Sequence, residues 1–332
     1  MPDRSTTKAS DKRPIVLFTT SLNESKLNRH VIGAIRLALQ DRFDVEFLTP
    51  ESLIQKPDLS GYALLLYVGS SLSEPVPLAT IAAMARLADV PSVFLATDDP
   101  YEFDARYRAN DFTIYLSNDR NAAAHFVERE LVYHLPLAAS LEDRRDITPF
   151  DQRKVGAFFC GYHYENRRRL ITDLLNVPGY SRNDLVIMGG TWNIPGLYEI
   201  SSDCDHDSLI NTYGLVKYVL NIGRTYDIAN VHRKIVSTTP GPRTFECALA
   251  GTPQIYFCNS LEIEEYFEPN KEILVVEGVD EAVEQMRWLR ERPDVWLQIA
   301  HAAQKRTAAE HLYKHRLEKM LSILDDVGIS FP

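Results

Sequence analysis

The sequence has no apolar run that approaches the roughly 20 residues of a membrane-spanning helix. Its opening, MPDRSTTKASDKR, is polar and carries charges of both signs, so residues 1–13 are expected to form a disordered tail and not a signal peptide. The four cysteines (Cys160, Cys204, Cys247 and Cys258) are widely spaced and form no CxxC pair. This argues against a disulfide scaffold or a zinc ribbon. We therefore expect a cytoplasmic protein with reduced thiols.

Positive charge is also scarce. The chain has 36 Lys and Arg against 46 Asp and Glu, a formal net charge of −10 at pH 7. Such a charge repels phosphate backbones at long range, so no nucleic-acid partner is expected. A few arginines gathered at one point can still bind a small anion, because the total charge does not reveal local clusters.

Several catalytic motifs are missing as well. No GxSxG elbow, P-loop or GxGxxG fingerprint occurs, which leaves the hydrolase, NTPase and dinucleotide-dehydrogenase classes without support. His311 and His315 have the i,i+4 spacing of metal ligands, but they lack the HExxH glutamate and a nearby third ligand. We expect this pair to pack or to form hydrogen bonds, and we predict no metal site.

What the sequence does contain is an alternation of short apolar strands and helices. RPIVLFTTS and YALLLYVGS are typical of buried parallel strands, and helical segments, one of them over Ala122–Glu130, lie between such runs. This pattern favours doubly wound α/β domains, and 332 residues exceed what one core usually serves. A polar stretch over residues 141–153 is the expected linker between domains of residues 14–140 and 154–310. A terminal helical segment occupies residues 311–332.

In open α/β sheets, ligands bind beyond the carboxyl ends of the strands. Polar, glycine-rich and charged residues follow these ends in both halves, as in GSS, TDDP, CGYHYENRRR and TTPGPRTFE. Two such edges that face each other form an interdomain cleft, where small molecules are often bound.

The strongest local pattern is STTPGPRTFECALAGTPQIYF, in which a loop leads into a helix that stops at Gly251. A glycine-containing loop at a helix N-terminus offers unpaired backbone N–H groups and the positive end of the helix dipole, which suits a diphosphate. Gly241 lies in this loop, and Arg243 in the first turn adds a bidentate phosphate donor. Glu246, one turn later, can accept two hydroxyls of a ribose. The pattern also fits an ordinary helix in which Glu246 caps the helix or forms a salt bridge.

This segment and the chain after it resemble the C-terminal half of the spore-maturation, CgeB-like glycosyltransferase family. That family has R-x-F-E-x-x-x-x-G-x-P, then F-E-P-x-x-E, then a terminal E-H-x-Y-x-H-R. The N-terminal half is similar too, in TDDP, HLPLA, GAFFCGYHYENRRRL and YVLNIGR, and the resemblance covers about residues 14–320. The matching residues of the three C-terminal motifs are Arg243, Phe245, Glu246, Gly251, Pro253, Phe267, Glu268, Pro269, Glu272, Glu310, His311, Tyr313, His315 and Arg316.

The resemblance implies a GT-B fold, in which two Rossmann-like domains face each other across a cleft. It implies transfer of a sugar from a UDP-, GDP- or dTDP-sugar to an acceptor hydroxyl or amine of a natural product, saccharide or protein. The second domain would hold the donor and the first the acceptor, with residues 311–332 crossing back to the first domain. The resemblance also implies metal independence and no cofactor beyond the donor. The acceptor and the oligomeric state do not follow from it.

Positions within this fold predict further roles. Gly161 would let the diphosphate approach the backbone. Arg168 or Arg169 on the next helix, and Arg224, are the candidate phosphate-binding cations, and Trp192 would either stack on the base or pack the domain. The remaining candidates are Gly189, Gly190, Thr191, Thr238 and Thr239 on the donor side, and Asn23, Gly69, Ser70 and Tyr101 on the acceptor side.

One position departs from related GT-B enzymes, which carry two glutamates in the pattern Glu-x7-Glu. Glu246 fits the second glutamate, but Thr238 occupies the first, which contacts the sugar. That contact would then come from Thr238, Thr239 or the backbone. The departure leaves the sugar and the retaining or inverting outcome open. It also prompts an alternative, a degenerate nucleotide-sugar-binding or scaffold protein without turnover.

For an inverting reaction, the first domain should supply the base. Asp98 and Asp99 end its fourth strand, where a carboxylate near an acceptor hydroxyl can take the proton as attack proceeds. Because Asp before Pro often caps a turn, we expect one of the two to be functional and the other structural. His30, after the first strand, is the second candidate for the base.

Overall fold

The computed structural model describes residues 13–22, 29–200, 205–225, 228–258 and 260–331. The first twelve residues of the predicted tail and the predicted acceptor residue Asn23 lie outside these ranges. Within them, no helix is long and apolar enough to cross a membrane. Cys160, Cys247 and Cys258 are free thiols.

Six parallel strands from the first part of the chain form one sheet, in the order β2-β1-β3-β4-β5-β6. Strand β3, LLLYVG, is buried at every position, as expected of a parallel strand covered on both faces. The elements are β1 (Ile15–Thr20), α1 (Arg29–Gln40), β2 (Asp44–Phe47), α2 (Pro50–Leu53), β3 (Leu64–Gly69), α3 (Leu78–Leu87), β4 (Ser92–Ala96), η1 (Phe103–Ala109), β5 (Ile114–Ser117), α4 (Arg120–Ala124) and β6 (Val132–His134).

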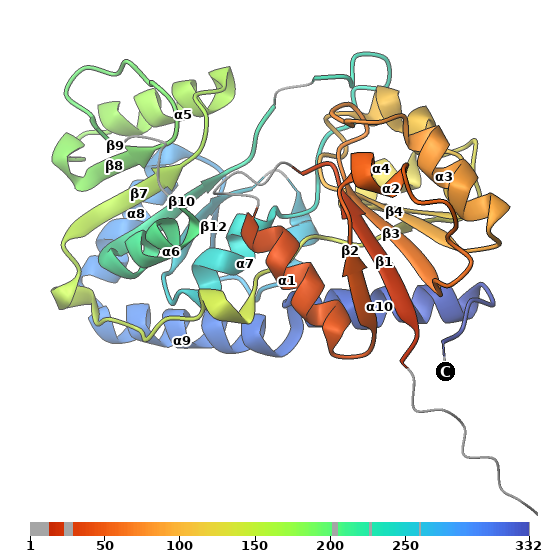
Figure 1. Cartoon of the computed structure of the whole chain (residues 1–332). Coiled ribbons are helices and arrows are strands. Elements are labelled where there is room, and N and C mark those ends of the chain that lie inside the picture. Colours follow the sequence, from red (N-terminus) through yellow and green to blue (C-terminus); the bar gives the residue numbers. More distant parts are fainter. Residues whose placement is uncertain (1–12, 23–28, 201–204, 226–227, 259, 332) are drawn as a thin grey trace, which may run out of the picture.

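A second parallel sheet follows, in the order β12-β11-β10-β7-β8-β9. Figure 1 shows the two sheets side by side, each flanked by helices. The elements are η2 (Leu141–Asp143), η3 (Phe150–Gln152), β7 (Val155–Cys160), α5 (Glu165–Asn176), η4 (Arg182–Asp184), β8 (Leu185–Met188), β9 (Tyr198–Ile200), α6 (His206–Leu215), β10 (Val216–Ile222), α7 (Pro242–Leu249), β11 (Gln254–Phe257), η5 (Leu261–Glu265), β12 (Leu274–Val276), α8 (Val279–Arg290), α9 (Pro293–Glu310) and α10 (Tyr313–Asp326).

The predicted α/β class with two Rossmann-like sheets is confirmed, but two elements differ from expectation. The helix predicted over Ala122–Glu130 ends at Ala124. Beyond it, Phe126 packs against the rings of Phe103 and Tyr115, with centroids 5.1 and 4.6 Å away, and this contact with the core replaces further helix. The short edge strand β9 was not predicted, because three residues carry no periodicity.

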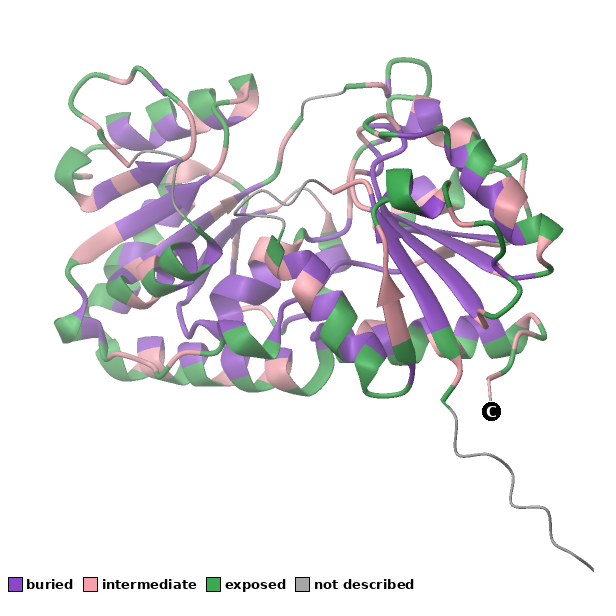
Figure 2. Cartoon of the chain, in the orientation of Figure 1, coloured by how far each residue is buried: buried purple, intermediate pink, exposed green. Residues whose placement is uncertain are grey.

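Apolar side chains fill the space between each sheet and its helices. Figure 2 shows that the inner strands of both sheets are largely buried. In the first domain, α1 and α10 cover one sheet face and α3 covers the other. In the second, α5, α8 and α9 share a core with β7 and β10. The carboxyl ends of the strands are left for polar residues.

The chain returns to the first domain at its end. Helix α9 packs on the second domain, and α10 runs beneath the first sheet (Figure 1). The break between them is fixed at Ala139, whose N–H donates to His311 O (3.2 Å) and whose carbonyl accepts from Tyr313 N–H (3.1 Å). His311 itself is buried against the carbonyl of Tyr266, with Nε2 to O at 3.0 Å. This placement suits the packing role expected for His311.

Candidate functional site

A cavity of about 470 Å³ lies between the two domains, at the carboxyl ends of both sheets. It brings together ten of the residues predicted to form the site and leaves out the others that the structure describes. The ten are His30, Asp98, Asp99, Tyr101, Gly161, Arg224, Thr239, Gly241, Arg243 and Glu246. The predicted residues that do not line it are Gly69, Ser70, Arg168, Arg169, Gly189, Gly190, Thr191, Trp192 and Thr238.

The N-terminus of α7 opens directly onto this cavity. Gly241 is the N-cap and makes no side-chain cap. Pro242, the first helical residue, has no N–H, and Thr244 N–H donates to Gly241 O (3.0 Å), so the N–H of Arg243 is the first-turn donor left for a ligand. Arg243 follows, and its Nε is buried with no hydrogen-bond partner among the described residues. An arginine whose buried Nε lacks a hydrogen-bond partner, beside a helix N-terminus, forms a site for an anion.

A second arginine, Arg167, reaches the cavity from α5. Its Nε donates to the carbonyls of Ile222 (3.2 Å) and Gly223 (3.3 Å). Burial, together with the positive charges of Arg243 and Arg224, lowers the pKa of Arg167 to about 10. Gly161 admits this side chain, because a Cβ there would lie 2.9 Å from its NH1. Three mutually repelling cations favour a multivalent anion between them.

Arg167 takes the place that the sequence assigned to its neighbours. Arg168 and Arg169 are exposed on α5, and Arg169 pairs with Asp173 at 4.0 Å, away from the cavity. The helix turns about 100° per residue, so only one of three consecutive arginines can point inward. The apolar spacing could have identified Arg167, since Arg167, Ile171 and Leu174 share the buried face of the helix.

The third arginine, Arg224, already has a partner across the cleft. It donates to Asp98 Oδ1 at 2.5 Å, and its guanidinium carbon lies 3.7 Å from the centroid of the Tyr101 ring. Asp98 and Tyr101 belong to the first domain and Arg224 to the second. Arg224, a predicted phosphate-binding cation, and Asp98, a predicted catalytic base, are therefore paired with each other.

Asp99 is held inside the first domain, although it also borders the cavity. Only 2% of it is exposed, and Oδ2 accepts from Ser117 Oγ (2.7 Å) and Tyr115 OH (3.0 Å). Burial raises its pKa to about 7, against the effect of those hydrogen bonds. Its contacts are those of a structural residue.

His206, which the sequence did not predict as a site residue, also lines the cavity. The ring of His206, at the start of α6, stacks on that of His30, with centroids 3.4 Å apart and planes 4° apart. His30 Nε2 lies 3.2 Å from Glu246 Oε1, and His206 Nε2 lies 2.7 Å from Asp143 Oδ1 in the linker. No local pattern marks His206, because its partners are distant in sequence.

The charges in this group are set by their neighbours. Burial opposes ionisation of both Glu246 and His206. The hydrogen bond and charge of His30, then His206 and Arg243, nevertheless lower the pKa of Glu246. The hydrogen bond with Asp143 and the charge of Glu246 raise the pKa of His206.

His30, His206 and Glu246 each offer a ligand atom, and these atoms lie within 4.8 Å of one another. An imidazole binds a metal along the lone pair in its ring plane. Two parallel planes 3.4 Å apart share no such position, so in this arrangement the stacked pair does not converge on one ion.

Other predicted site residues have structural surroundings. Trp192 is fully buried, its indole N–H donates to Gly189 O (3.0 Å), and its ring packs edge-on against Phe159, so it packs the domain and cannot stack on a base. The backbone N–H of Thr238 donates to Asp119 Oδ2 (2.8 Å) in the first domain. Ser70 Oγ donates to the buried Glu102 (2.6 Å).

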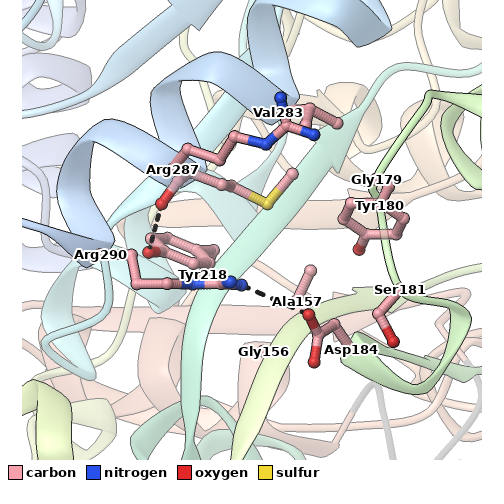
Figure 3. A pocket seen from close by; sticks show the side chains of 11 residues that line it. Gly156, Ala157, Gly179, Tyr180, Ser181, Asp184, Tyr218, Val283, Arg287 and Arg290 are labelled. Atoms are coloured by element: carbon pink, nitrogen blue, oxygen red, sulfur yellow. Dashed lines mark hydrogen bonds and ion pairs between the residues drawn. The ribbon is translucent and has the colours of Figure 1, made fainter.

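A second, much smaller hollow of about 20 Å³ lies at the opposite, amino end of β7 (Figure 3). Two of its polar groups are already engaged, since Tyr218 OH donates to Met286 O (2.8 Å) and Arg290 pairs with Asp184 (3.3 Å), whereas the buried Tyr180 OH has no hydrogen-bond partner among the described residues. It is too small for a substrate, and the large cavity is the candidate site.

The architecture is that of GT-B glycosyltransferases. Anabaena HepE, solved in complex with UDP and glucose, aligns over 94% of this chain and all of its own, with 13% identity and a TM-score of 0.62. Sucrose-phosphate synthase from Thermosynechococcus elongatus aligns over 95% and 99% of the two chains, with 11% identity and a TM-score of 0.64. A glycosyltransferase from Rickettsia africae covers 96% and 99%, with 11% identity and a TM-score of 0.61.

Part of the sequence also matches a known protein family. Residues 167–322, which include Arg167, Arg224, Arg243 and Glu246, match the family described as glycosyl transferase-like. No curated protein matches the chain.

Proposed function

We propose that the protein transfers a sugar from a nucleoside-diphosphate sugar to an acceptor hydroxyl or amine. The observation that carries the proposal is Arg243, whose buried Nε has no hydrogen-bond partner among the described residues, at the open N-terminus of α7. Arg167 and Arg224 border the same cavity. A diphosphate would satisfy all three cations and the helix N-terminus together.

The remaining donor contacts follow from this placement. Glu246 has one carboxylate oxygen on His30, which leaves the other for a ribose hydroxyl. The positive groups neutralise the leaving diphosphate, so we propose a reaction that needs no metal ion. The bound UDP of HepE supports a uridine donor as the first to test. The CgeB-like subfamily and the cytoplasmic location remain predictions.

We propose His30 as the base, in preference to Asp98 and Asp99. Asp98 is paired with Arg224, and Asp99 is buried among its own hydrogen bonds. If the Nε2–H of His30 donates to Glu246, then Nδ1, which has no partner among the described residues, is the nitrogen left to accept a proton. The acceptor oxygen bonds to the anomeric carbon, the bond to the diphosphate breaks, and the hydroxyl proton passes to His30 with inversion at that carbon.

Calorimetric titration with UDP, GDP and dTDP tests the donor site, and a coupled nucleotide-release assay with the corresponding sugars tests turnover. We expect micromolar to millimolar binding of one diphosphate and release of nucleotide that depends on an acceptor. If no diphosphate binds at millimolar concentration, the donor site is wrong. Binding without release would instead favour the degenerate binder, the alternative prompted by Thr238 in the place of the first glutamate.

A further inference from the structure

The base proposed above belongs to the first domain, but the groups around its ring belong to the second domain and the linker. His30 is at the start of α1, Glu246 is in α7, and His206 is at the start of α6. Asp143, which holds His206, lies in the linker. The ring of His30 is therefore contacted by side chains from across the cleft, those of His206 and Glu246.

His206 contacts His30 through the face of its ring. Its ring lies flat on that of His30, at 3.4 Å and 4°. Only 8% of His206 and 2% of Asp143 are exposed, so water does not screen this pair as it screens a surface ion pair. A carboxylate on Nε2 fixes the plane of the ring and favours its protonated form.

We propose that His206, held by Asp143, is a positioning residue that fixes the ring of His30 and tunes its affinity for a proton from the opposite domain. The proposal rests on the proposed function, in which His30 is the base. It means that the base is complete only when the domains are together, and that the donor-binding carboxylate Glu246 takes part in completing it.

The electrostatic effect has a definite sign. A positive charge on His206 opposes a second positive charge on the stacked ring of His30, and two unit charges about 4 Å apart repel by about 1 kcal/mol even in water. Asp143 and Asp207 offset part of this on the side of His206. Glu246 acts in the opposite direction on His30, Arg243 adds to the positive side, and the buried hydroxyl of Tyr313 in α10 is a neighbour of Glu246.

The test is NMR titration of His30 in the full chain, with histidine-selective labelling and His30→Gln to assign the signal. His206→Phe keeps a flat ring without the charge, and His206→Asn removes both. In both variants we expect the pKa of His30 to rise by about half a unit or more. Asp143→Asn, which leaves the ring in place, should give a smaller rise. His301→Phe, an exposed histidine on α9, is the matched control and should change nothing.

Activity gives a second, separate readout. His206→Asn should lower kcat about tenfold with the diphosphate Kd within twofold of wild type, and His206→Phe should recover most of that loss. An unchanged pKa of His30 in His206→Phe overturns the proposal. So does stoichiometric Co²⁺ binding that is lost in His206→Asn, since the cluster would then be a metal site. Because the NMR titration needs no donor, a failure of the donor site would appear in the diphosphate titration and in kcat, and would leave the NMR result unchanged.

Discussion

The two sides of the cavity differ in how far their polar groups are already satisfied. On the second domain, Arg243 has an unpartnered nitrogen, and Arg167 has only carbonyl partners among the hydrogen bonds of the described residues. On the first domain, Asp98 is paired with Arg224, and Asp99 accepts hydrogen bonds from the hydroxyls of Ser117 and Tyr115. The donor side is therefore preorganised for an anion, whereas on the acceptor side Nδ1 of His30 is buried and has no hydrogen-bond partner among the described residues.

The largest expected effect is the loss of kcat on substitution of His30. His30→Gln should lower kcat by about 10²–10⁴-fold, the usual contribution of a positioned base, while diphosphate affinity changes little. Nucleotide-release kinetics and calorimetry measure the two quantities. Asp98→Asn is the comparison, and a larger loss of kcat in Asp98→Asn than in His30→Gln would return the base to the carboxylate.

Substitutions on the donor side should change the affinity for the diphosphate. Arg243→Ala should weaken diphosphate binding about a hundredfold, because it removes a charge-assisted contact in a partly buried site. The melting temperature should change little, since the buried Nε of Arg243 has no hydrogen bond to lose among the described residues and its charge interaction with Glu246 is the main contact removed.

A matched pair on one helix sharpens this test. Arg167→Ala should weaken diphosphate binding, and Arg169→Ala, two residues along α5 and exposed, should not. Equal losses in the two variants would mean that the effect is only one of total charge, and a large fall in melting temperature of Arg243→Ala would mean that its role is structural.

The same contrast explains what the sequence could predict. Alternating strands and helices predicted both sheets, and the loop before α7 predicted Gly241, Arg243 and Glu246, because these features are local. The choice among Arg167, Arg168 and Arg169 needed the helix register, which Ile171 and Leu174 could have supplied. His206 could not be found in this way. Its role depends on a stack with a residue of the other domain, which only the tertiary structure brings near.

Asp99 provides a test by pH. Its folded pKa of about 7 lies above its ordinary value of 3.8, so the folded state binds this proton more tightly than the unfolded state does. Its contribution to stability is full below about pH 4 and is lost as the pH rises to about 7. Between pH 5 and pH 7 the wild type should lose about 2 kcal/mol relative to Asp99→Asn. Urea unfolding of both proteins at several pH values measures this, and parallel curves would contradict it.

The smallest expected effect is on diphosphate affinity and comes from the ion pair of Asp98 and Arg224, which joins the two domains. If Asp98 competes with the diphosphate for Arg224, Asp98→Asn should strengthen diphosphate binding by about threefold to tenfold, because the cation no longer has to leave a carboxylate. Arg224→Ala should weaken binding, and in the double variant the gain from Asp98→Asn should vanish, since the two residues act through one contact. A gain that persists without Arg224 would show that Asp98 repels the diphosphate directly. A loss in Asp98→Asn would show that the carboxylate aligns Arg224 for the donor, which would make the acceptor side a supporting part of the donor site.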